Sequence, residues 1–497
     1  MVRRSRVVIL ATFVLGYPCD AHAQRVPDAS TALVGAHVVD VERGVILPRQ
    51  VVLVRGDRIV RVAPAGAVAL PRGTRVVRVD GAYVIPGLWD MHVHHYGNTR
   101  LAPDAPRVVG TMSVSYFQAL LVAAGVTGVR DMGGDLAAIM ESAPDIPRGT
   151  RVGPRLVATG QQLGGRPVVP GAPFPIRTVD DVRRSIALLQ GSDAGHVKLV
   201  DLPPELHRAA LRACATAGIP CVSHLRPNMP LAEQSELGVR SLEHLFLFAE
   251  NVSSYPFERI ARWRDEAARP TIWRRILYKL RLRERPRTRL ERASASYDST
   301  KADHLFRLLA RNGTRVTPTL LLHDLLNRVE PLDTLARNAD FMTESLGPGF
   351  RSEVRSAEQL ALARRTQALQ FRLVREMHAA GVPLLAGTDA PLQSAPGFAL
   401  HGELALLQRA GLRPIDALRT ATLEPARYLG ATDTLGTVRE GRVADLVVLR
   451  RNPLEDVRHT RDIEMVMTRG RLLNRRQLDA LVAPDLRQAG SSPVRRP

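Results

Sequence analysis

The sequence predicts an α/β fold, a (β/α)8 TIM barrel that carries a small β-sandwich domain built from both ends of the chain. Between residues 86 and 430, short apolar segments alternate with stretches long enough for a helix, which is typical of a parallel sheet. Eight such segments are present, the number of strands in a closed barrel. Shorter strand-like runs, interrupted by Gly and Pro, flank this region on both sides.

These runs set the expected domain boundaries. The barrel is expected over residues 86–430, the two parts of the sandwich over 31–85 and 431–475, and a flexible tail over 476–497. The first barrel strand is expected in VIPGLWDMHVH, which begins at residue 84. The other seven are expected in GVTGVRDMG, PRLVATG, HVKLVD, IPCVSHL, GVRSLEHL, TRVTPTLLL and VPLLAGTD.

One connection, residues 246–313, is too long for a simple barrel loop, and it predicts an insertion over 251–312 before the seventh strand. The insertion contains WRRILYKLRLRERPRTRLER, which indicates a basic, partly amphipathic helix. Such a helix could cover the barrel mouth or touch an anionic membrane surface. We favour a solvated helical insertion, because runs of charge usually face water.

The N-terminal residues 1–23 have the composition of a secretory signal peptide. Arg3, Arg4 and Arg6 precede a ten-residue apolar run, and Ala21-His22-Ala23 offers small residues for cleavage near Ala23-Gln24. A retained membrane anchor is less favoured, because crossing a bilayer takes about 20 apolar residues. The mature chain is therefore expected in a bacterial periplasm or outside the cell.

The formal net charge of +20 does not predict a nucleic-acid partner. Only Lys198, Lys279 and Lys301 are lysines among 69 basic residues, so arginine is spread through the chain rather than gathered in a patch. Aromatic residues make up 4%, too few for base-stacking platforms. We expect a small-molecule partner and no nucleic acid, while an oligomer remains open.

Two cysteines, Cys214 and Cys221, lie in RACATAGIPCVSH on an expected helix end and the next strand. In an oxidising compartment they could form a disulfide. The interpretation we favour is two small buried side chains, because free cysteines are commonly buried.

His92 and His94 lie two residues apart where Val or Ile would pack better. Side chains at positions i and i+2 of a strand share one face, about 6.6 Å apart along its axis. Their rings can therefore converge on one metal ion. On their own, two hydrogen-bonded core histidines would be a fair alternative.

Four further candidates lie near the ends of later predicted strands, and these ends meet at one mouth of a barrel. Three of them are ordinary metal ligands, whereas a lysine ammonium would be repelled by divalent cations. The four are Lys198, His224, His244 and Asp389.

Lys198 is unusual in a chain that uses Arg for nearly every basic residue. Burial and nearby positive charge lower the pKa of a lysine. The neutral amine can take up carbon dioxide to form a carbamate, an anion able to bridge two metals. The alternative is a lysine whose stem packs in the barrel floor while its ammonium reaches water.

Several stretches resemble the amidohydrolase superfamily, and within it exported relatives of imidazolonepropionase-like amidohydrolases and Xaa-Pro dipeptidases. They extend over nearly all of the expected mature chain and include GLWDMHVH, LLVAAGVTGVRDMGG, GPRLVATG, GVRSLEHL, AGVPLLAGTDAP, HGELALLQRAGLRPIDALRTATLEPARYLG and LGTVREGRVADLVVLRRNPLED.

The resemblance implies two divalent metal ions, with zinc favoured over manganese or cobalt because the ligands are imidazoles. It implies that His92, His94 and Asp389 hold one ion, His224 and His244 the other, and carbamylated Lys198 bridges them. A hydroxide shared by the ions would be the nucleophile. Asp389 would be the catalytic residue that moves its proton to the leaving amine.

The chain departs from the dipeptidase pattern at Arg166 and Arg226, which stand where those relatives tend to have His and Tyr. Arginine suits bidentate capture of a carboxylate, so these residues and His323 are candidates for substrate binding. Either arginine could instead face solvent.

The sequence thus predicts an exported binuclear metal-dependent hydrolase of amide or peptide-like C–N bonds, acting on a dipeptide or acyl-amino acid. Two alternatives remain open. One is a mononuclear cyclic amide or lactone hydrolase in which Lys198 stays unmodified. The other is a periplasmic binding protein without catalysis, held to anionic lipid by its basic insertion.

Overall fold

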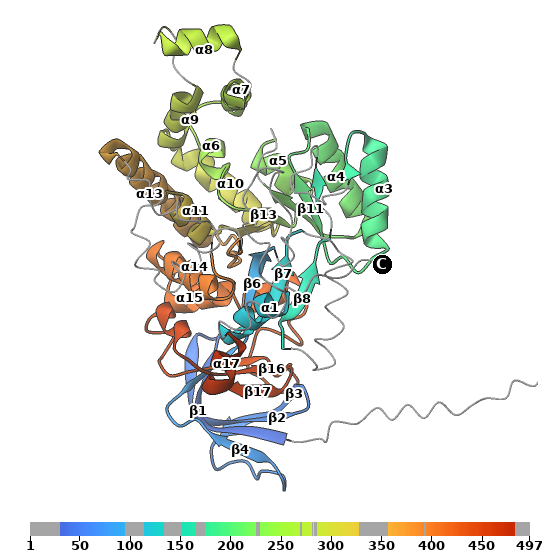
Figure 1. Cartoon of the computed structure of the whole chain (residues 1–497), viewed down its shortest axis with the longest axis vertical. Helices are drawn as coiled ribbons and strands as arrows, with labels where there is room; N and C mark the ends of the chain where they lie inside the picture. The colour runs from blue at the N-terminus through green and yellow to red at the C-terminus, as the bar shows by residue number, and fades with distance from the viewer. Residues whose placement is uncertain are drawn as a thin grey trace, which may run out of the picture.

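The computed structural model describes residues 30–94, 114–133, 152–160, 162–164, 174–224, 229–268, 271–280, 282, 286–327, 356–391 and 394–482. Strands from the two ends of the chain lie at one pole of the molecule, parallel strands and their helices lie in the middle, and α7, α8 and α9 lie at the other pole (Figure 1). The predicted signal peptide falls outside the described residues. Of the flexible tail predicted over 476–497, residues 483–497 also fall outside them, whereas residues 476–481 belong to helix α17 (Arg475–Leu481), whose Leu478 is buried.

Both ends of the chain contribute to one eight-stranded sheet, in the order β17-β16-β15-β5-β1-β2-β3, with β4 beside β1. The two ends are joined where β15 pairs with β5, because Leu446 to Leu449 run antiparallel to Tyr83 to Pro86. The description of this part as a β-sandwich stays a prediction. The strands are β1 (Ser30–Asp40), β2 (Val45–Arg55), β3 (Arg58–Pro64), β4 (Arg75–Arg78), β5 (Tyr83–Pro86), β15 (Leu446–Leu449), β16 (Ile463–Thr468) and β17 (Arg471–Asn474).

The strands of the middle region are parallel and lie in two sheets, β6-β7-β8 and β10-β9-β11-β12-β13-β14. Most of their described side chains are buried, which is typical of parallel strands covered on both faces. The α/β class with parallel strands is therefore confirmed. The strands are β6 (Leu88–Val93), β7 (Val126–Asp131), β8 (Arg155–Ala158), β9 (Leu163–Gly164), β10 (Phe174–Pro175), β11 (Val197–Val200), β12 (Cys221–His224), β13 (Ser241–Glu243) and β14 (Arg315–Thr317).

The eighth predicted segment, residues 383–390, lies between these two sheets. Leu384 forms a parallel bridge with Val316 of β14, and Ala390 forms one with Val93 of β6. At the other side, the backbone N–H of Gly195 donates to the carbonyl of Ala158, which links β8 to the approach to β11. Parallel bridges thus join the two sheets at the first of these junctions, and a backbone hydrogen bond joins them at the second.

Helices cover the outside of the parallel strands, and four of them, α7 to α10, fall within residues 251–312, where the insertion is predicted (Figure 1). Among the described residues, no helix has the length and apolar character needed to cross a bilayer. The helices are α1 (Val114–Ala123), α3 (Val179–Gln190), α4 (Pro204–Ala217), α5 (Leu231–Glu236), α6 (Phe248–Asn251), α7 (Phe257–Ala268), α8 (Ile272–Lys279), α9 (Pro286–Ala295), α10 (Ser299–Arg311), α11 (Leu320–Asn327), α13 (Ala357–Ala379), α14 (Phe398–Arg409), α15 (Pro414–Thr420), α16 (Leu423–Tyr428), α17 (Arg475–Leu481) and the 3-10 helix η3 (Val457–Arg461).

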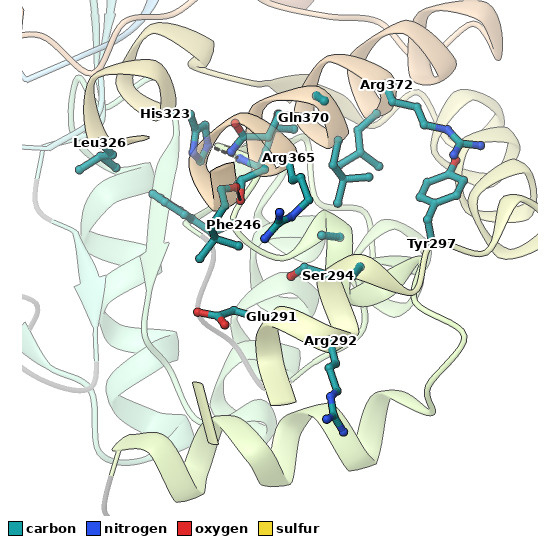
Figure 2. Close-up of a pocket in the computed structure, with 18 of the residues that line it drawn as sticks. Phe246, Glu291, Arg292, Ser294, Tyr297, His323, Leu326, Arg365, Gln370 and Arg372 are labelled. Carbon is teal, nitrogen blue, oxygen red and sulfur yellow. Dashed lines mark hydrogen bonds between the residues drawn. The ribbon is translucent and has the colours of Figure 1, made fainter. Parts of the chain in front are cut away.

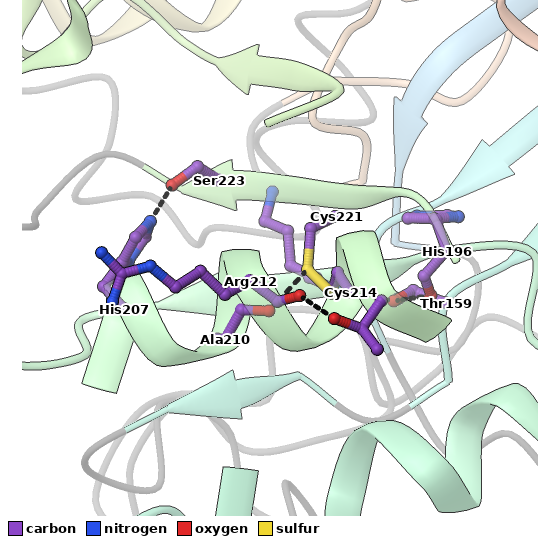
Figure 3. The surroundings of a disulfide bond; sticks show 10 residues. Thr159, His196, His207, Ala210, Arg212, Cys214, Cys221 and Ser223 are labelled. Atoms are coloured by element: carbon purple, nitrogen blue, oxygen red, sulfur yellow. Dashed lines mark hydrogen bonds between the residues drawn. A yellow bond between two sulfur atoms is a disulfide. The ribbon is translucent and has the colours of Figure 1, made fainter. Parts of the chain in front are cut away.

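Cys214 at the end of α4 and Cys221 at the start of β12 form a disulfide, with a Cα–Cα distance of 6.0 Å (Figure 3). The favoured expectation of two free buried cysteines is therefore wrong. Both side chains are 2% exposed, so burial alone did not distinguish the two states. The bridge ties α4 to the strand that ends at His224.

His401 of α14 is a buried histidine that joins three parts of the fold. Its Nε2 lies 3.0 Å from the carbonyl oxygen of Ala124, and its Nδ1 lies 2.9 Å from Oγ1 of Thr460 in η3. Burial, with the charge of Arg461, lowers the pKa of His401 to about 3. The ring is therefore neutral in the folded protein at neutral pH.

We expect His401 to make the folded state sensitive to acid. Between pH 6.5 and about 3 an unfolded histidine binds a proton that the folded His401 does not, so the free energy of unfolding falls as the pH is lowered through this window. The His401→Gln variant lacks this contribution. Urea unfolding of both proteins at pH 7, 6 and 5 should show a steeper loss for the wild type, and parallel losses would contradict the assignment.

Candidate metal centre

Five of the six predicted metal ligands lie in parallel strands or directly after them, at or close to the C-terminal ends. The sixth, Asp389, lies near the end of the 383–390 segment, which follows α13. Because parallel strands end at the same edge, these positions converge. The described structure places them in β6 and the residue after it (His92, His94), in β11 (Lys198), at the end of β12 (His224), directly after β13 (His244) and in the 383–390 segment (Asp389).

Three of these residues form a compact cluster suited to a metal ion. Oδ1 of Asp389 lies 3.2 Å from Nε2 of His92 and 3.1 Å from Nε2 of His94. The ligand atoms of His92, His94 and Asp389 all lie within 4.8 Å of one another. Two imidazole nitrogens and a carboxylate are a common ligand set for divalent metals.

A buried ion pair fixes the orientation of His92. Nδ1 of His92 lies 2.8 Å from Oε2 of Glu243, and the same carboxylate accepts hydrogen bonds from Arg130 at 2.9 and 3.0 Å. Burial alone would raise the pKa of Glu243, but Arg130 and His92 outweigh it and hold this pKa well below its usual value. The ionised Glu243 accepts the Nδ1 proton of His92 and leaves Nε2 as the metal-facing atom.

His224 and His244 lie beside this cluster. The ring centroids of His92 and His244 are 4.6 Å apart, and those of His224 and His244 are 4.9 Å apart. Nδ1 of His244 lies 2.8 Å from Oγ1 of Thr319, so its Nε2 is left for a ligand. Burial, together with Lys198, lowers the pKa of His224 to about 3. The neutral imidazole that results is the form that binds metals.

Lys198 is almost fully buried among these groups, with 1% of its surface exposed. Burial lowers the pKa of Lys198 to about 8, although Glu243 and Asp389 act in the opposite direction. Within the described structure, Nζ of Lys198 and Nε2 of His92 are both buried without a hydrogen-bond partner. Buried polar atoms normally have partners, so two such atoms beside the cluster fit a site that receives a metal ion.

The backbone around the centre is held in uncommon conformations. His244 has φ +66° and Asp389 has φ +60°, values in the left-handed region that side chains other than Gly rarely adopt. A side chain at Gly387 would meet Cβ of His92 at 2.7 Å and Cγ2 of Thr317 at 2.6 Å. Such strain clusters at functional sites, because it aims ligands that relaxed strands would point elsewhere.

Three residues predicted to bind substrate have different outcomes. Arg166 and Arg226 lie outside the described residues. His323 of α11 is 4% exposed, and its Nε2 accepts a hydrogen bond from the backbone N–H of Leu245 at 3.0 Å. Its ring is 4.7 Å from that of Phe246, which in turn is 5.3 Å from His244.

Both His323 and Phe246 line a cavity of about 730 Å³ (Figure 2). The other walls come from α9 and α13, and Figure 2 shows the side chain of Arg365 extending into this space. The cavity thus adjoins His244 through Phe246, and its lining combines apolar side chains with polar and charged ones. A concave site of this size with apolar walls and polar groups can hold a small molecule.

Sequence analysis missed the residues that support the ligands. Arg130 and Glu243 are fully buried charges on β7 and β13. Asp90 of β6 is a third fully buried ionisable residue, and burial raises its pKa to about 7. Its carboxyl group accepts hydrogen bonds from Oγ1 of Thr388 at 2.6 Å and from the backbone N–H of Thr388, the residue before Asp389, at 3.1 Å. A charged residue inside an otherwise apolar strand segment is the signal that could have identified all three.

We expect Glu243→Gln to weaken metal binding by 10- to 100-fold, because residues that orient ligating histidines typically contribute that much. The glutamine amide can donate a hydrogen bond to Nδ1 of His92. The ring would then carry its own proton on Nε2, the nitrogen that has to be free to bind the metal. Competition with a chelator, followed by metal analysis, measures the affinity. Glu233→Gln, at a carboxylate of α5 paired with Arg208, is the matched control. Equal affinity in all three proteins would contradict the role of Glu243.

Comparison with known families agrees with this geometry. The model of the Amidohydrolase family matches residues 304–473, a region that includes Asp389 and His401. Ochratoxinase from Aspergillus niger is 38% identical over 81 residues, which span 16% of this chain and 16% of ochratoxinase. The aligned stretch is thus a small part of either protein.

Solved structures match far more of the chain. Bottromycin amidohydrolase is 25% identical with a TM-score of 0.64, covering 93% of this chain and 91% of the other. A Xaa-Pro dipeptidase with bound methionine in its active site is 18% identical with a TM-score of 0.63, and the match covers 90% of this chain and 100% of the dipeptidase. The Aspergillus niger ochratoxinase structure is 19% identical with a TM-score of 0.61, and the match covers 90% of this chain and 96% of ochratoxinase. The ligand cluster, the match of the Amidohydrolase family model over residues 304–473 and these structural likenesses together support the resemblance of the chain to the amidohydrolase superfamily.

Proposed function

We propose that the protein is an exported, binuclear metal-dependent hydrolase that cleaves amide or peptide-like C–N bonds in small substrates. The observation that carries the proposal is the convergence of five metal-ligand side chains around the buried Lys198. Two of the proteins to which the chain is similar, Xaa-Pro dipeptidase and bottromycin amidohydrolase, support amide or peptide chemistry by their names.

The two parallel sheets belong, in this proposal, to one closed (β/α)8 barrel. Hydrogen bonds across β14, the 383–390 segment and β6 support closure on one side. The bond from Gly195 to Ala158 supports it on the other. A closed barrel explains why ligands from strands far apart in sequence reach one mouth.

The donor set divides between two ions. His92, His94 and Asp389 would hold one ion, and His224 and His244 would hold the other. Lys198, as a carbamate formed with carbon dioxide, would supply the anion between them. Divalent ions at such a site, with zinc favoured by the imidazoles, provide a nucleophilic water at neutral pH and polarise the scissile carbonyl.

Asp389 moves the proton in this scheme. Burial alone would raise its pKa, but the adjacent imidazoles of His92 and His94 hold the pKa of Asp389 well below its usual value. The carboxylate is therefore ionised, and it accepts a proton from the attacking water and passes it to the leaving amine. Asp90, through Thr388, positions this residue.

A test of the reaction uses a panel of dipeptides and acyl-amino acids, with zinc or manganese and bicarbonate present. We expect hydrolysis by protein that carries two ions per chain. Lys198→Ala should lose at least 100-fold in kcat/KM and bind fewer ions, because the bridging anion is missing. Added short carboxylic acids should restore part of the activity by placing a carboxylate where the carbamate was.

The outcomes of this test separate the alternatives. One ion per chain, with an active Lys198→Ala protein, would favour the mononuclear cyclic amide or lactone hydrolase. Folded, metal-loaded protein that hydrolyses nothing in the panel would favour the periplasmic binding protein. The cost of burying His92, His244 and Asp389 without metal argues against the second alternative.

We propose that the substrate carries a carboxylate that Arg166 or Arg226 binds. Because arginine pairs with a carboxylate in a bidentate manner, Arg166→Ala and Arg226→Ala should raise KM at least tenfold for free acids. The kcat/KM for the matching amidated substrates should not change. Arg183→Ala, at an exposed arginine of α3, serves as the control. An unchanged KM for free acids in both variants would show that neither arginine binds the carboxylate.

A further inference from the structure

Helix α8 exposes an unusual number of large apolar side chains. Ile272 and Trp273 are 72% and 73% exposed, and Leu280 and Leu282 just after the helix are 60% and 73% exposed. Ile276 adds a further exposed side chain at 41%. Single exposed apolar residues are common on proteins, but five within eleven positions mark an interaction site.

These side chains form one stripe. Ile272, Ile276 and Leu280 are spaced four residues apart, and the N–H of Leu280 still donates to the carbonyl of Ile276 at 2.9 Å, so the helical path continues beyond Lys279. Residues at this spacing lie on the same face of a helix, and Trp273 widens that face. We call Ile272, Trp273, Ile276 and Leu280 the α8 stripe.

The remaining face of the helix is basic. Residues 271–283 contain five Arg or Lys and no Asp or Glu. Arg275 and Lys279 of α8 are exposed. By helical spacing, both flank the α8 stripe rather than interrupt it.

Ion pairs hold α8 so that its stripe faces away from the protein. Nη1 of Arg274 lies 3.3 Å from Oε1 of Glu266 in α7, and Oε2 of Glu266 lies 3.0 Å from Arg289 of α9. These contacts fix the polar side of α8 against its neighbours. Figure 1 shows α8 at the outer end of the molecule, beyond α7 and α9.

We propose that the α8 stripe docks on the surface of an anionic phospholipid bilayer. Trp and aliphatic side chains enter the interfacial region of a bilayer, and flanking Arg and Lys attract anionic headgroups. A second copy of the chain is a poor occupant, because a face-to-face pair would oppose Arg275 and Lys279 with the same positive charges. Docking does not depend on the hydrolytic function.

Trp273 allows a direct test in the full chain. With phosphatidylglycerol-containing vesicles that carry brominated acyl chains, the fluorescence of Trp273, obtained by difference from Trp273→Phe, should be quenched and blue-shifted. Residues 1–23 contain no tryptophan, so the predicted leader does not contribute to this fluorescence. Phosphatidylcholine vesicles should produce a much smaller change.

Sedimentation with vesicles measures the strength of docking. This assay does not use tryptophan fluorescence, so it also reports on variants without Trp273. The Trp273→Glu/Ile276→Glu double variant should partition onto anionic vesicles at least tenfold more weakly than the wild type. Arg275→Gln and Lys279→Gln should each lower it about fivefold, as expected for one basic residue near an anionic surface. Leu188→Glu, which changes a 62% exposed leucine on α3, should bind as the wild type does.

Three results would overturn the proposal. The first is that Trp273 fluorescence is not quenched by the vesicles, and the second is that both kinds of vesicle quench it equally. The third is that the wild type binds no vesicles but self-associates, and that Trp273→Glu/Ile276→Glu abolishes this self-association. The last result would assign the stripe to a second copy. Unchanged hydrolysis of a soluble substrate by this variant would show that the fold and metal centre are intact.

Discussion

The candidate metal centre depends on the buried pair of Arg130 and Glu243. Arg130 on β7 donates to Glu243 on β13, to Oγ1 of Thr317 on β14 and to the carbonyl of Met91 on β6. One guanidinium therefore connects strands from both parallel sheets. Removing one partner from a buried pair costs about 3–5 kcal/mol, because the other charge is left without compensation.

The same pair determines the chemistry at His92. Arg130 is the largest influence that keeps Glu243 ionised against its burial, and an ionised Glu243 selects the His92 tautomer whose Nε2 faces the centre. The face of the Arg130 guanidinium also lies 4.7 Å from the ring centre of Tyr428 in α16, a cation–π contact. Strand register, ligand orientation and helix packing are thus set by one network, so that a change in any member alters the others.

Sequence analysis identified the candidate ligands but not the residues that support them, for a physical reason. His92 and His94 stand out because two imidazoles on one strand face are costly in an apolar core unless they bind something. The parallel α/β class followed from alternation alone. Glu243 and Arg130 lie far apart in sequence, and only the folded chain brings them together, so neither showed that its charge had a partner. The Cys214–Cys221 disulfide was missed because a buried thiol and a buried disulfide occupy similar apolar surroundings.

The inserted helices connect the candidate site with the surface at the far pole. Glu291 and Ser294 of α9 line the cavity next to His323, while Arg289 of the same helix shares Glu266 with α8. Through the ion pairs of Glu266 with Arg274 and Arg289, α8 is linked to the helix that forms one wall of the cavity. An insertion of this kind is costly to order in water with its apolar stripe exposed. Ordering the insertion becomes favourable if the α8 stripe is buried against a partner surface while α9 forms a wall of the cavity. The stripe and the cavity wall would then be two parts of one structural element.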